Sequence, residues 1–353
     1  MIKYIKVNLL ILLSLIIFLE LAGQIAFRVK NDRFLFDHTF LKLRSQLFEQ
    51  HPYLSIALKK NAHVNFDHGG EYESVRTTEF GTRWTGADMN DTSAIRIACI
   101  GGSTTFCTGV SDEDSWPAQL QKKLGKKYAV VNFGVPSYNT VEGLIQMALY
   151  IPEVRPDIVI FHQGTNDLYN YYLENNYPDY RFHADHVMPS ALLAVRNNEP
   201  FFDKASRYSA IFWMTSRIAA RFNKPEIPVK RSEPDALVDY LFQRNLRNML
   251  ALADNIPAQS IFIGQVKNPH HNNQDDNPWA FRVKPELVLP FMARMNKMAE
   301  SICALDTACA YYDFMNTIKW QPDHFWDSMH LTKEGNELFA ERLAEVIRSK
   351  EAE

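Results

Sequence analysis

IRIACIGGSTT, residues 95–105, indicates a buried strand that ends in a glycine-rich turn. Its first six residues, Ile95–Ile100, are nearly all apolar, as expected of a parallel strand covered on both faces. Similar apolar runs follow at Ala129–Phe133, Asp157–Gln163, Ser260–Val266 and Cys309–Phe314. Helical patterns separate most of these runs, and the last helix is expected to begin at Thr332, a good N-cap. This alternation predicts an α/β fold, a doubly wound sheet of five parallel strands.

The N-terminus carries a second clear pattern. Lys3 and Lys6 precede an almost unbroken apolar run from Val7 to Leu19, which resumes after Glu20. About 20 mostly apolar residues span a bilayer, so we expect residues 1–27 to form an uncleaved signal anchor. A cleaved signal peptide is the alternative, although neither an A-x-A site nor a lipobox cysteine follows the apolar core. Because long domains cross membranes largely regardless of flanking charge, we expect a single-pass protein whose main domain is extracytoplasmic.

These patterns divide the remainder of the chain. We expect an N-terminal extension over residues 28–92, in which His68-Gly69-Gly70 and Glu79–Arg83 form loops with short strands. The α/β domain follows over residues 93–353. Within it, residues 168–232 interrupt the alternation and are rich in aromatic side chains. Unusually long connections are often lids or binding loops; an inserted subdomain that packs for stability alone is the alternative.

Residues that could take part in catalysis follow four of the expected strands. Ser103 comes after the first strand and Gly134 after the second, while Gly164-Thr165-Asn166-Asp167 comes after the third. Asp327 and His330 lie beyond the fifth strand, just before the final helix. Ligands of open parallel sheets bind beyond the carboxyl ends of the strands, so these side chains are expected to meet at one edge.

Each of these residues can supply one part of an acyl-transfer site. A serine in a tight strand-to-helix turn can present both its hydroxyl and its own N–H. A histidine can take the serine proton, and an aspartate can hold that histidine in the right tautomer. A glycine allows the main chain to approach as a donor, and an asparagine amide offers another. Each motif alone is commonly only a turn, a cap or a surface pair, and the order of all four favours catalysis.

With these residues the sequence resembles the SGNH (GDSL-type) hydrolases, a family named for serine, glycine, asparagine and histidine in four blocks. The resemblance extends from about Ile95 to Ile347, and it implies a flavodoxin-like three-layer sandwich. It implies catalysis by Ser103, Asp327 and His330, with an oxyanion hole made by the Ser103 and Gly134 N–H groups and the Asn166 amide. Family members are mostly esterases, lipases, thioesterases and carbohydrate acetylesterases, and no cofactor is implied.

The sequence departs from the family pattern at two positions. Gly102 and Thr104 replace the aspartate and leucine of Gly-Asp-Ser-Leu. Neither belongs to the triad, so the departure concerns the subgroup more than the chemistry. Phe80-Gly81-Thr82-Arg83 and the anchor resemble a membrane-tethered bacterial branch of the family.

Composition and motifs argue against other functions. Among 353 residues the formal net charge is −3, and no long basic run suggests nucleic acid. Neither the Walker pattern nor the dinucleotide pattern follows the first strand. Histidines 183, 186, 270, 271 and 324 lack a spaced acidic partner for a metal site, so no metal is expected.

Several alternatives stay open at this point. The substrate is expected to be an acyl ester of a glycan or a lipid, with small acyl groups on an extracytoplasmic glycan favoured. An acyltransferase, or an acyl-handling component of a membrane acylation system, would need the same triad. Protein partners and oligomeric state are not predicted. Cys303 and Cys309 could form a disulfide or remain free buried thiols.

Overall fold

The computed structural model describes residues 2–31, 33–37, 39–67, 72–168, 201–222, 236–269 and 285–351. The tract His68–Gly70, the tyrosines between 169 and 180, and histidines 183, 186, 270 and 271 lie outside these residues. The expectations for them are therefore not tested.

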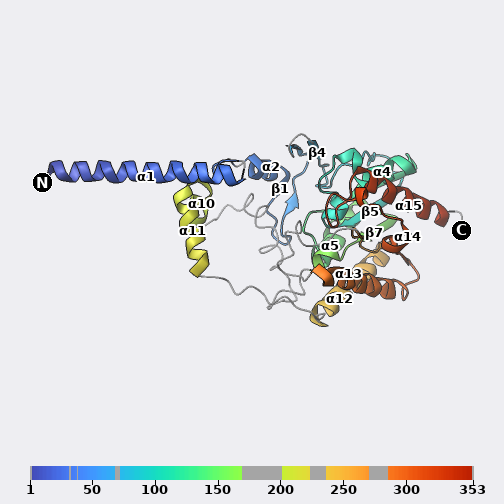
Figure 1. Cartoon of the computed structure of the whole chain (residues 1–353). Coiled ribbons are helices and arrows are strands. Elements are labelled where there is room, and N and C mark those ends of the chain that lie inside the picture. Colours follow the sequence, from blue (N-terminus) through green and yellow to red (C-terminus); the bar gives the residue numbers. More distant parts are fainter. Residues whose placement is uncertain are drawn as a thin grey trace. The chain divides into compact units, whose positions relative to one another are not determined.

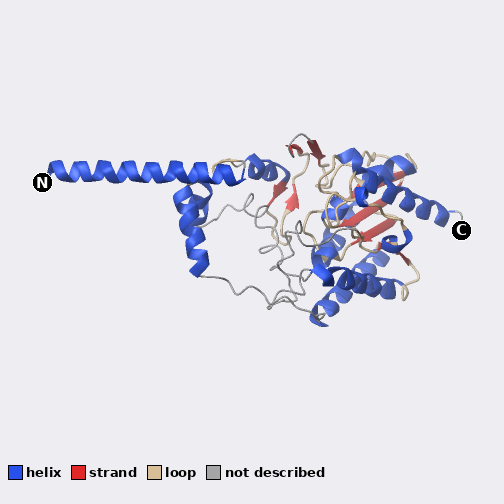
Figure 2. Ribbon diagram, in the orientation of Figure 1, coloured by secondary structure: helices blue, strands red, loops and turns tan. Residues whose placement is uncertain are grey.

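A parallel sheet forms the centre of the larger part of the protein (Figure 2). Its five strands are β5 (Ile95–Gly101), β6 (Tyr128–Asn132), β7 (Ile158–His162), β8 (Gln259–Ile263) and β9 (Cys309–Tyr312). They lie in the order β6-β5-β7-β8-β9, and every neighbouring pair is parallel. Each strand coincides with one of the five apolar runs, so the predicted sheet is confirmed.

Helices cover both faces of this sheet. Side chains alternate along β5, so Ala98 and Ile100 enter one core while Ile97 and Cys99 enter the other. The first core is closed by α5 (Thr140–Leu149), α6 (Ile151–Val154), α12 (Ala236–Asn255) and α13 (Pro285–Cys303). The second is closed by α4 (Trp116–Leu124), α14 (Phe314–Thr317) and α15 (Lys333–Glu351). The three-layer sandwich is therefore confirmed.

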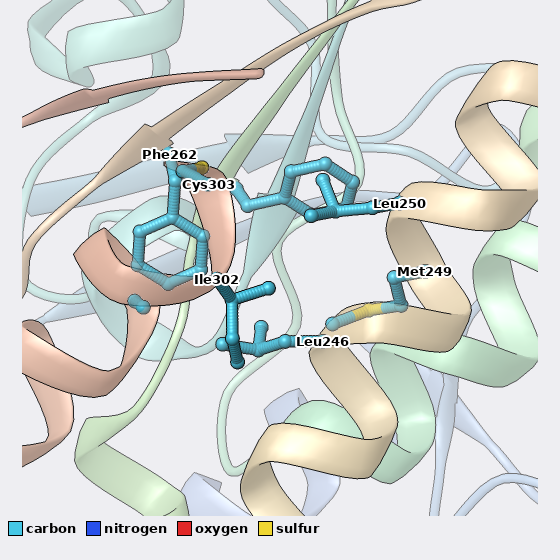
Figure 3. Close-up of a pocket in the computed structure, with 8 residues that line it drawn as sticks. Leu246, Met249, Leu250, Phe262, Ile302 and Cys303 are labelled. Atoms are coloured by element: carbon cyan, nitrogen blue, oxygen red, sulfur yellow. The ribbon is translucent and has the colours of Figure 1, made fainter. Parts of the chain in front are cut away.

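One apolar gap in the first core is part of its packing. Figure 3 shows Leu246, Met249 and Leu250 of α12 opposite Ile302 and Cys303 of α13, with Phe262 of β8 beside them. The gap has no room for a water-sized sphere and is lined only by apolar residues. It belongs to the hydrophobic core.

Short elements precede the sheet. Helix α2 (Thr39–Leu47) leads into the antiparallel pair β1 (Phe48–Glu49) and β2 (Ala57–Leu58). A hairpin follows, made of β3 (His63–Asp67) and β4 (Tyr72–Arg76). The described part of residues 39–76 thus contains one short helix and two antiparallel strand pairs.

The end of α13 and the start of β9 are joined covalently. Cys303 and Cys309 form a disulfide with a Cα–Cα distance of 5.1 Å, whereas Cys99 and Cys107 are free and buried. The final helix begins just after Thr332, whose Oγ1 accepts a hydrogen bond from the Gly335 N–H at 3.3 Å. Thr332 is therefore the N-cap, as predicted.

The N-terminal helix α1 (Ile2–Asn31) is long and apolar enough for a membrane span or a signal anchor, with mean hydropathy 2.4 over an 18-residue stretch. It belongs to a compact unit made of Met1–Arg44 and Leu193–Ile227. That unit also contains α10 (Phe201–Tyr208) and α11 (Ala210–Phe222). Ser45–Leu192 and Pro228–Glu353 form a second unit, which holds the sheet.

Candidate active site

Ser103 and His330 meet beyond the carboxyl end of the sheet. Ser103 begins the short helix α3 (Ser103–Phe106), directly after β5. His330 lies in the loop before α15, and its Nε2 is 2.8 Å from the Ser103 Oγ across a separation of 227 residues. The serine can therefore donate its proton to this imidazole.

Asp327 holds the other side of the imidazole. Its Oδ2 lies 2.7 Å from His330 Nδ1, and its Oδ1 accepts hydrogen bonds from the N–H groups of Met329 and His330, each at 2.7 Å. Burial raises the pKa of Asp327, but the hydrogen bond and charge of His330 together with these two N–H groups outweigh it and lower the pKa overall. An ionised Asp327 fixes the Nδ1–H tautomer, which leaves Nε2 as the acceptor for Ser103.

Trp326 packs against the histidine from outside. Its indole is stacked on His330 with ring centroids 5.1 Å apart and an interplanar angle of 17°. Its Nε1 donates to the Thr108 carbonyl at 3.2 Å, which ties the histidine loop to the loop after α3. Half of the Trp326 surface is exposed, so the residue both braces His330 and borders solvent.

Asn166 lies beside the nucleophile turn. It belongs to α7 (Thr165–Leu168), and its Nδ2 donates to the Tyr138 carbonyl at 2.8 Å. An amide nitrogen carries two hydrogens, so this contact orients Asn166 and leaves the second hydrogen for another acceptor. A Cβ on Gly102 would come within 2.5 Å of Asn166 Nδ2. Glycine at position 102 therefore allows this close approach.

Gly134 differs from the expectation that its N–H belongs to an oxyanion hole. That N–H donates to Asn132 Oδ1 at 2.9 Å, so it is already engaged. A Cβ on Gly134 would lie 2.3 Å from the Phe106 nitrogen, which means that glycine is needed for the β6–α5 loop to pack against α3. Asn132 reinforces this contact because its Nδ2 donates to the Thr105 carbonyl at 3.0 Å.

The same loop approaches the site further along. Tyr138 contacts Asn166 through its carbonyl, and that carbonyl would lie 3.0 Å from a Cβ on Gly102. Ser137, just before it, is buried and has a left-handed backbone with φ 72°. Sequence reasoning missed Ser137, because a serine in a Pro-Ser-Tyr turn carries no signal for a left-handed position.

Arg83 is a second residue that sequence reasoning left without a role. Its buried guanidinium donates to Asp112 Oδ1 at 2.9 Å, to the Cys107 carbonyl at 2.8 Å and to the Val110 carbonyl at 2.6 Å. The Arg83 N–H also donates to the Asn132 carbonyl at 3.0 Å. Arg83 therefore holds the loop after α3, to which Trp326 is bonded, and so acts on the site through other residues.

Two buried carboxyl groups lie behind Asn166. Asp167 accepts hydrogen bonds from the Thr140 N–H and hydroxyl at the start of α5, and Glu142 caps the same helix by accepting from the Asn139 N–H at 3.0 Å. Burial raises the pKa of Asp167 to about 7 despite the Thr140 donors, and burial likewise raises that of Glu142 to about 7. Asp167 thereby links α7, which carries Asn166, to α5.

These pKa values predict how Asp167 affects stability with pH. The native Asp167 keeps its proton to a higher pH than the unfolded chain, so its contribution to the free energy of unfolding should fall as pH rises from 4 to 7. Asp167→Asn removes this titration. We expect urea unfolding to give a stability advantage of the wild type over Asp167→Asn that shrinks from pH 5 to pH 8.

Comparison with the variant isolates Asp167 from other groups that titrate in this range, of which Glu142 acts in the same direction and His162 in the opposite one. Burial lowers the pKa of His162 to about 4, so its contribution rises with pH over the same range. An advantage of the wild type that grows between pH 5 and pH 8 would contradict the raised pKa of Asp167.

Within the described residues no group of three histidine, cysteine, aspartate or glutamate side chains could hold a metal ion. His324 lies in the 3-10 turn Pro322–His324, where its Nδ1 accepts from the Gln321 N–H at 3.2 Å. Its position is explained by that turn.

Comparisons with known proteins agree with this architecture. The model of the GDSL-like lipase/acylhydrolase family matches residues 99–338. An acetylxylan esterase of Xylanibacter ruminicola is 38% identical over 87 residues, which are 21% of this chain and 17% of that protein. The chain thus matches only a small part of that relative's length.

Solved structures of low sequence identity resemble the chain. A psychrotrophic esterase from Pseudoalteromonas sp. is 13% identical with a TM-score of 0.43, and the match covers 73% of this chain and 100% of that protein's chain. An acetylxylan esterase from Geobacillus stearothermophilus is 14% identical with a TM-score of 0.41, covering 71% of this chain and 93% of its own. Scores this low carry no part of the assignment.

The family model spans well over half of the chain, from the first central strand into the last helix. The protein therefore belongs to the GDSL-like lipase/acylhydrolase family and is an enzyme that hydrolyses ester bonds.

Proposed function

We propose that the protein is a membrane-anchored serine esterase that removes small acyl groups, above all O-acetyl groups, from an extracytoplasmic glycan. The proposal depends on one observation, the hydrogen-bonded series Ser103 Oγ, His330 Nε2, His330 Nδ1 and Asp327 Oδ2. A hydroxyl, an imidazole and a carboxylate in this geometry activate a serine for attack on a carbonyl carbon.

In this mechanism the Ser103 oxygen attacks the ester carbonyl while His330 Nε2 takes the serine proton. Asp327 stabilises the resulting imidazolium. The tetrahedral intermediate collapses as Nε2 returns that proton to the departing alcohol, which leaves an acyl group on Ser103. Water then attacks the acyl-enzyme with Nε2 as base, and the acid leaves as Ser103 recovers its proton.

The negative charge on the carbonyl oxygen requires hydrogen-bond donors. We assign this task to the Ser103 N–H at the start of α3 and to the second amide hydrogen of Asn166. The Gly134 N–H is engaged by Asn132, so we assign the remaining main-chain donor to Ser137 in the same loop. Its support is the left-handed backbone of Ser137 and the position of Tyr138 beside Asn166.

Removal of the asparagine amide tests this assignment. Loss of one oxyanion donor typically lowers turnover by a factor of about 10²–10³. We therefore expect Asn166→Ala to reduce kcat by that factor and to keep a measurable residual activity. The measurement is the hydrolysis of nitrophenyl acetate by the purified variant. Asn65→Ala, in the exposed face of β3, serves as the matched control and should keep wild-type turnover. Unchanged kcat in Asn166→Ala would remove Asn166 from the oxyanion hole.

A cleft beside the histidine supports a glycan substrate. It has a volume of about 700 Å³ and is lined by the half-exposed Trp326 together with polar residues that include Ser111, Asp114, Lys333 and Glu334. Lys333 and Asp114 form an ion pair of 3.2 Å at this cleft. A sugar can stack its C–H face on an indole while its hydroxyls meet polar side chains. The acetylxylan esterase match, although short, supports the same substrate class.

The placement outside the cytoplasm has separate support. Helix α1 is long enough to anchor the chain. The disulfide between Cys303 and Cys309 suits an oxidising compartment, where such bonds persist.

A direct test compares substrates and products. We expect the purified full-length chain to release acetate from nitrophenyl acetate and from acetylated oligosaccharides faster than it releases long-chain acids from nitrophenyl esters. Acylated glycan without free acid would indicate a transferase, and faster turnover of long-chain esters would indicate a lipid substrate. No release of acid from any ester would contradict the proposed function.

A further inference from the structure

Glu20 is an acidic residue inside an otherwise apolar stretch of α1, and its carboxylate is fully engaged. It accepts hydrogen bonds from the Ser209 hydroxyl at 2.7 Å, from the Ala210 N–H at 2.7 Å and from the Ile211 N–H at 3.2 Å. Ala210 is the first residue of α11. The first N–H groups of a helix lack partners within it and favour negative charge. Glu20 therefore caps α11 from another helix.

Further contacts along α1 extend this junction by two turns. Gln24 donates to the Tyr208 carbonyl at 3.0 Å, and Gly23 lies so close to Ala210 that a Cβ on it would be 2.6 Å from the Ala210 Cβ. Phe27 meets Trp213 edge to face with ring centroids 5.3 Å apart. Figure 1 shows α10 and α11 beside the C-terminal half of α1. One side of α1 is thus the docking surface for α11.

The exposed surface of α10 and α11 includes large apolar side chains. Phe201 is 71% exposed, Phe202 is 70% exposed and Ile218 is 54% exposed. Residues 201–222 also carry four basic side chains against one acidic side chain. Exposed aromatic and aliphatic side chains next to Lys and Arg are typical of helices that lie in a membrane interface.

The depth of Glu20 in a bilayer places the start of α11 at that interface. Glu20 lies 16 residues beyond Tyr4, or about 24 Å at 1.5 Å per residue. The hydrocarbon core is about 30 Å thick, so with Tyr4 at one edge Glu20 lies near the other edge. A carboxylate at that depth is costly unless it is bonded, and its donors are Gln24 within α1, the Ser209 hydroxyl and the first turn of α11.

We propose that α10 and α11 form an interfacial docking element that lies in the headgroup layer of an anionic phospholipid bilayer. Ile218, Phe201 and Phe202 contact the acyl chains, and the exposed Lys204 and Arg217 contact lipid phosphates. The inference rests on the proposed membrane span of α1. It assigns the described part of the insertion, residues 201–222, to membrane attachment, so the exposed Phe201 and Phe202 contact lipid.

Depth-dependent fluorescence quenching tests the proposal on the full-length chain. The chain is placed in bilayers of phosphatidylcholine and phosphatidylglycerol that contain nitroxide lipids, labelled either near the headgroup or near the chain end. Ile218→Cys carries an environment-sensitive dye, and Ser216→Cys on another side of α11 is the matched control. The native free thiols are buried and the other two cysteines form a disulfide, so labelling is confined to the new cysteine. Leu13→Cys, within α1, reports the span itself.

We expect the dye at position 218 to be quenched several-fold more by the shallow nitroxide than the dye at position 216. The dye at position 13 should be quenched by the deep nitroxide. If position 13 is quenched and position 218 is not, the docking element is overturned while the anchor stands. If neither is quenched, both the span and the inference fail. Esterase turnover of the same samples reports separately on the catalytic proposal.

A cysteine pair tests the junction between the two helices. A Cβ on Gly23 would lie 2.6 Å from that of Ala210. Gly23→Cys with Ala210→Cys should therefore form a disulfide after the two helices separate by about 1 Å, since disulfides need a Cβ–Cβ distance of about 3.8 Å. Gly23→Cys with Ser216→Cys adds the same thiols at a position one to two turns along α11 and should stay reduced. Thiols are counted with a maleimide after unfolding. A disulfide in the second pair, or none in the first, would overturn the docking of α11 on α1.

Discussion

Ser103→Ala is expected to lower the turnover of nitrophenyl acetate by a factor on the order of 10⁶, because removal of a serine nucleophile has this effect in a triad hydrolase. The Ser103 side chain is partly exposed and its known contact is to His330, so its loss should leave the fold intact. The measurement is steady-state hydrolysis at saturating substrate, with circular dichroism to verify that the variant is folded.

Ser260→Ala provides the matched control for this substitution. Ser260 is buried in β8 of the same sheet, and its hydroxyl has no partner among the described residues. We expect this variant to keep wild-type turnover. If Ser103→Ala were as active as Ser260→Ala, Ser103 would not be the nucleophile.

His330→Ala is expected to lower kcat by a similar factor, on the order of 10⁶, since the serine then lacks its base. The two residues act as one unit, so the double variant Ser103→Ala with His330→Ala should be no less active than either single variant. Steady-state hydrolysis of the same ester by the three proteins gives this comparison.

The exposed His63 supplies the control for the histidine. It contacts Ser74 within the β3–β4 hairpin, and His63→Ala should retain wild-type activity. Two single effects that multiply in the double variant would show that Ser103 and His330 act independently, which contradicts proton transfer between them.

The sequence alone was sufficient for the sheet and for the central side chains. The five strands are continuous apolar runs because helices cover both faces of the sheet. The sequence of each run therefore indicates its burial without any knowledge of distant contacts. Parallel topology brings the carboxyl ends of strands to one edge, so the sequence predicts that Ser103, Asn166, Asp327 and His330 lie there. The structure places the Ser103, Asp327 and His330 side chains within hydrogen-bond distance in series.

Other features depend on contacts that no local pattern encodes. The glycine at position 134 is required by the approach of Phe106, and a glycine needed for packing cannot be distinguished in sequence from one that exposes an N–H. Arg83 lies in the extension, and its partners are main-chain carbonyls of the loop after α3. The partner of Glu20 lies about 190 residues away, so only the fold reveals that α11 belongs with the anchor.

Covalent trapping of Ser103 is the most direct test of the central claim. A fluorophosphonate reacts with a serine that a neighbouring base has activated, and the product is identified by peptide mass spectrometry. We predict one phosphonylated serine, Ser103, with labelling abolished in His330→Ala. A folded protein that stays unlabelled, or that carries the label on another serine, would contradict the account.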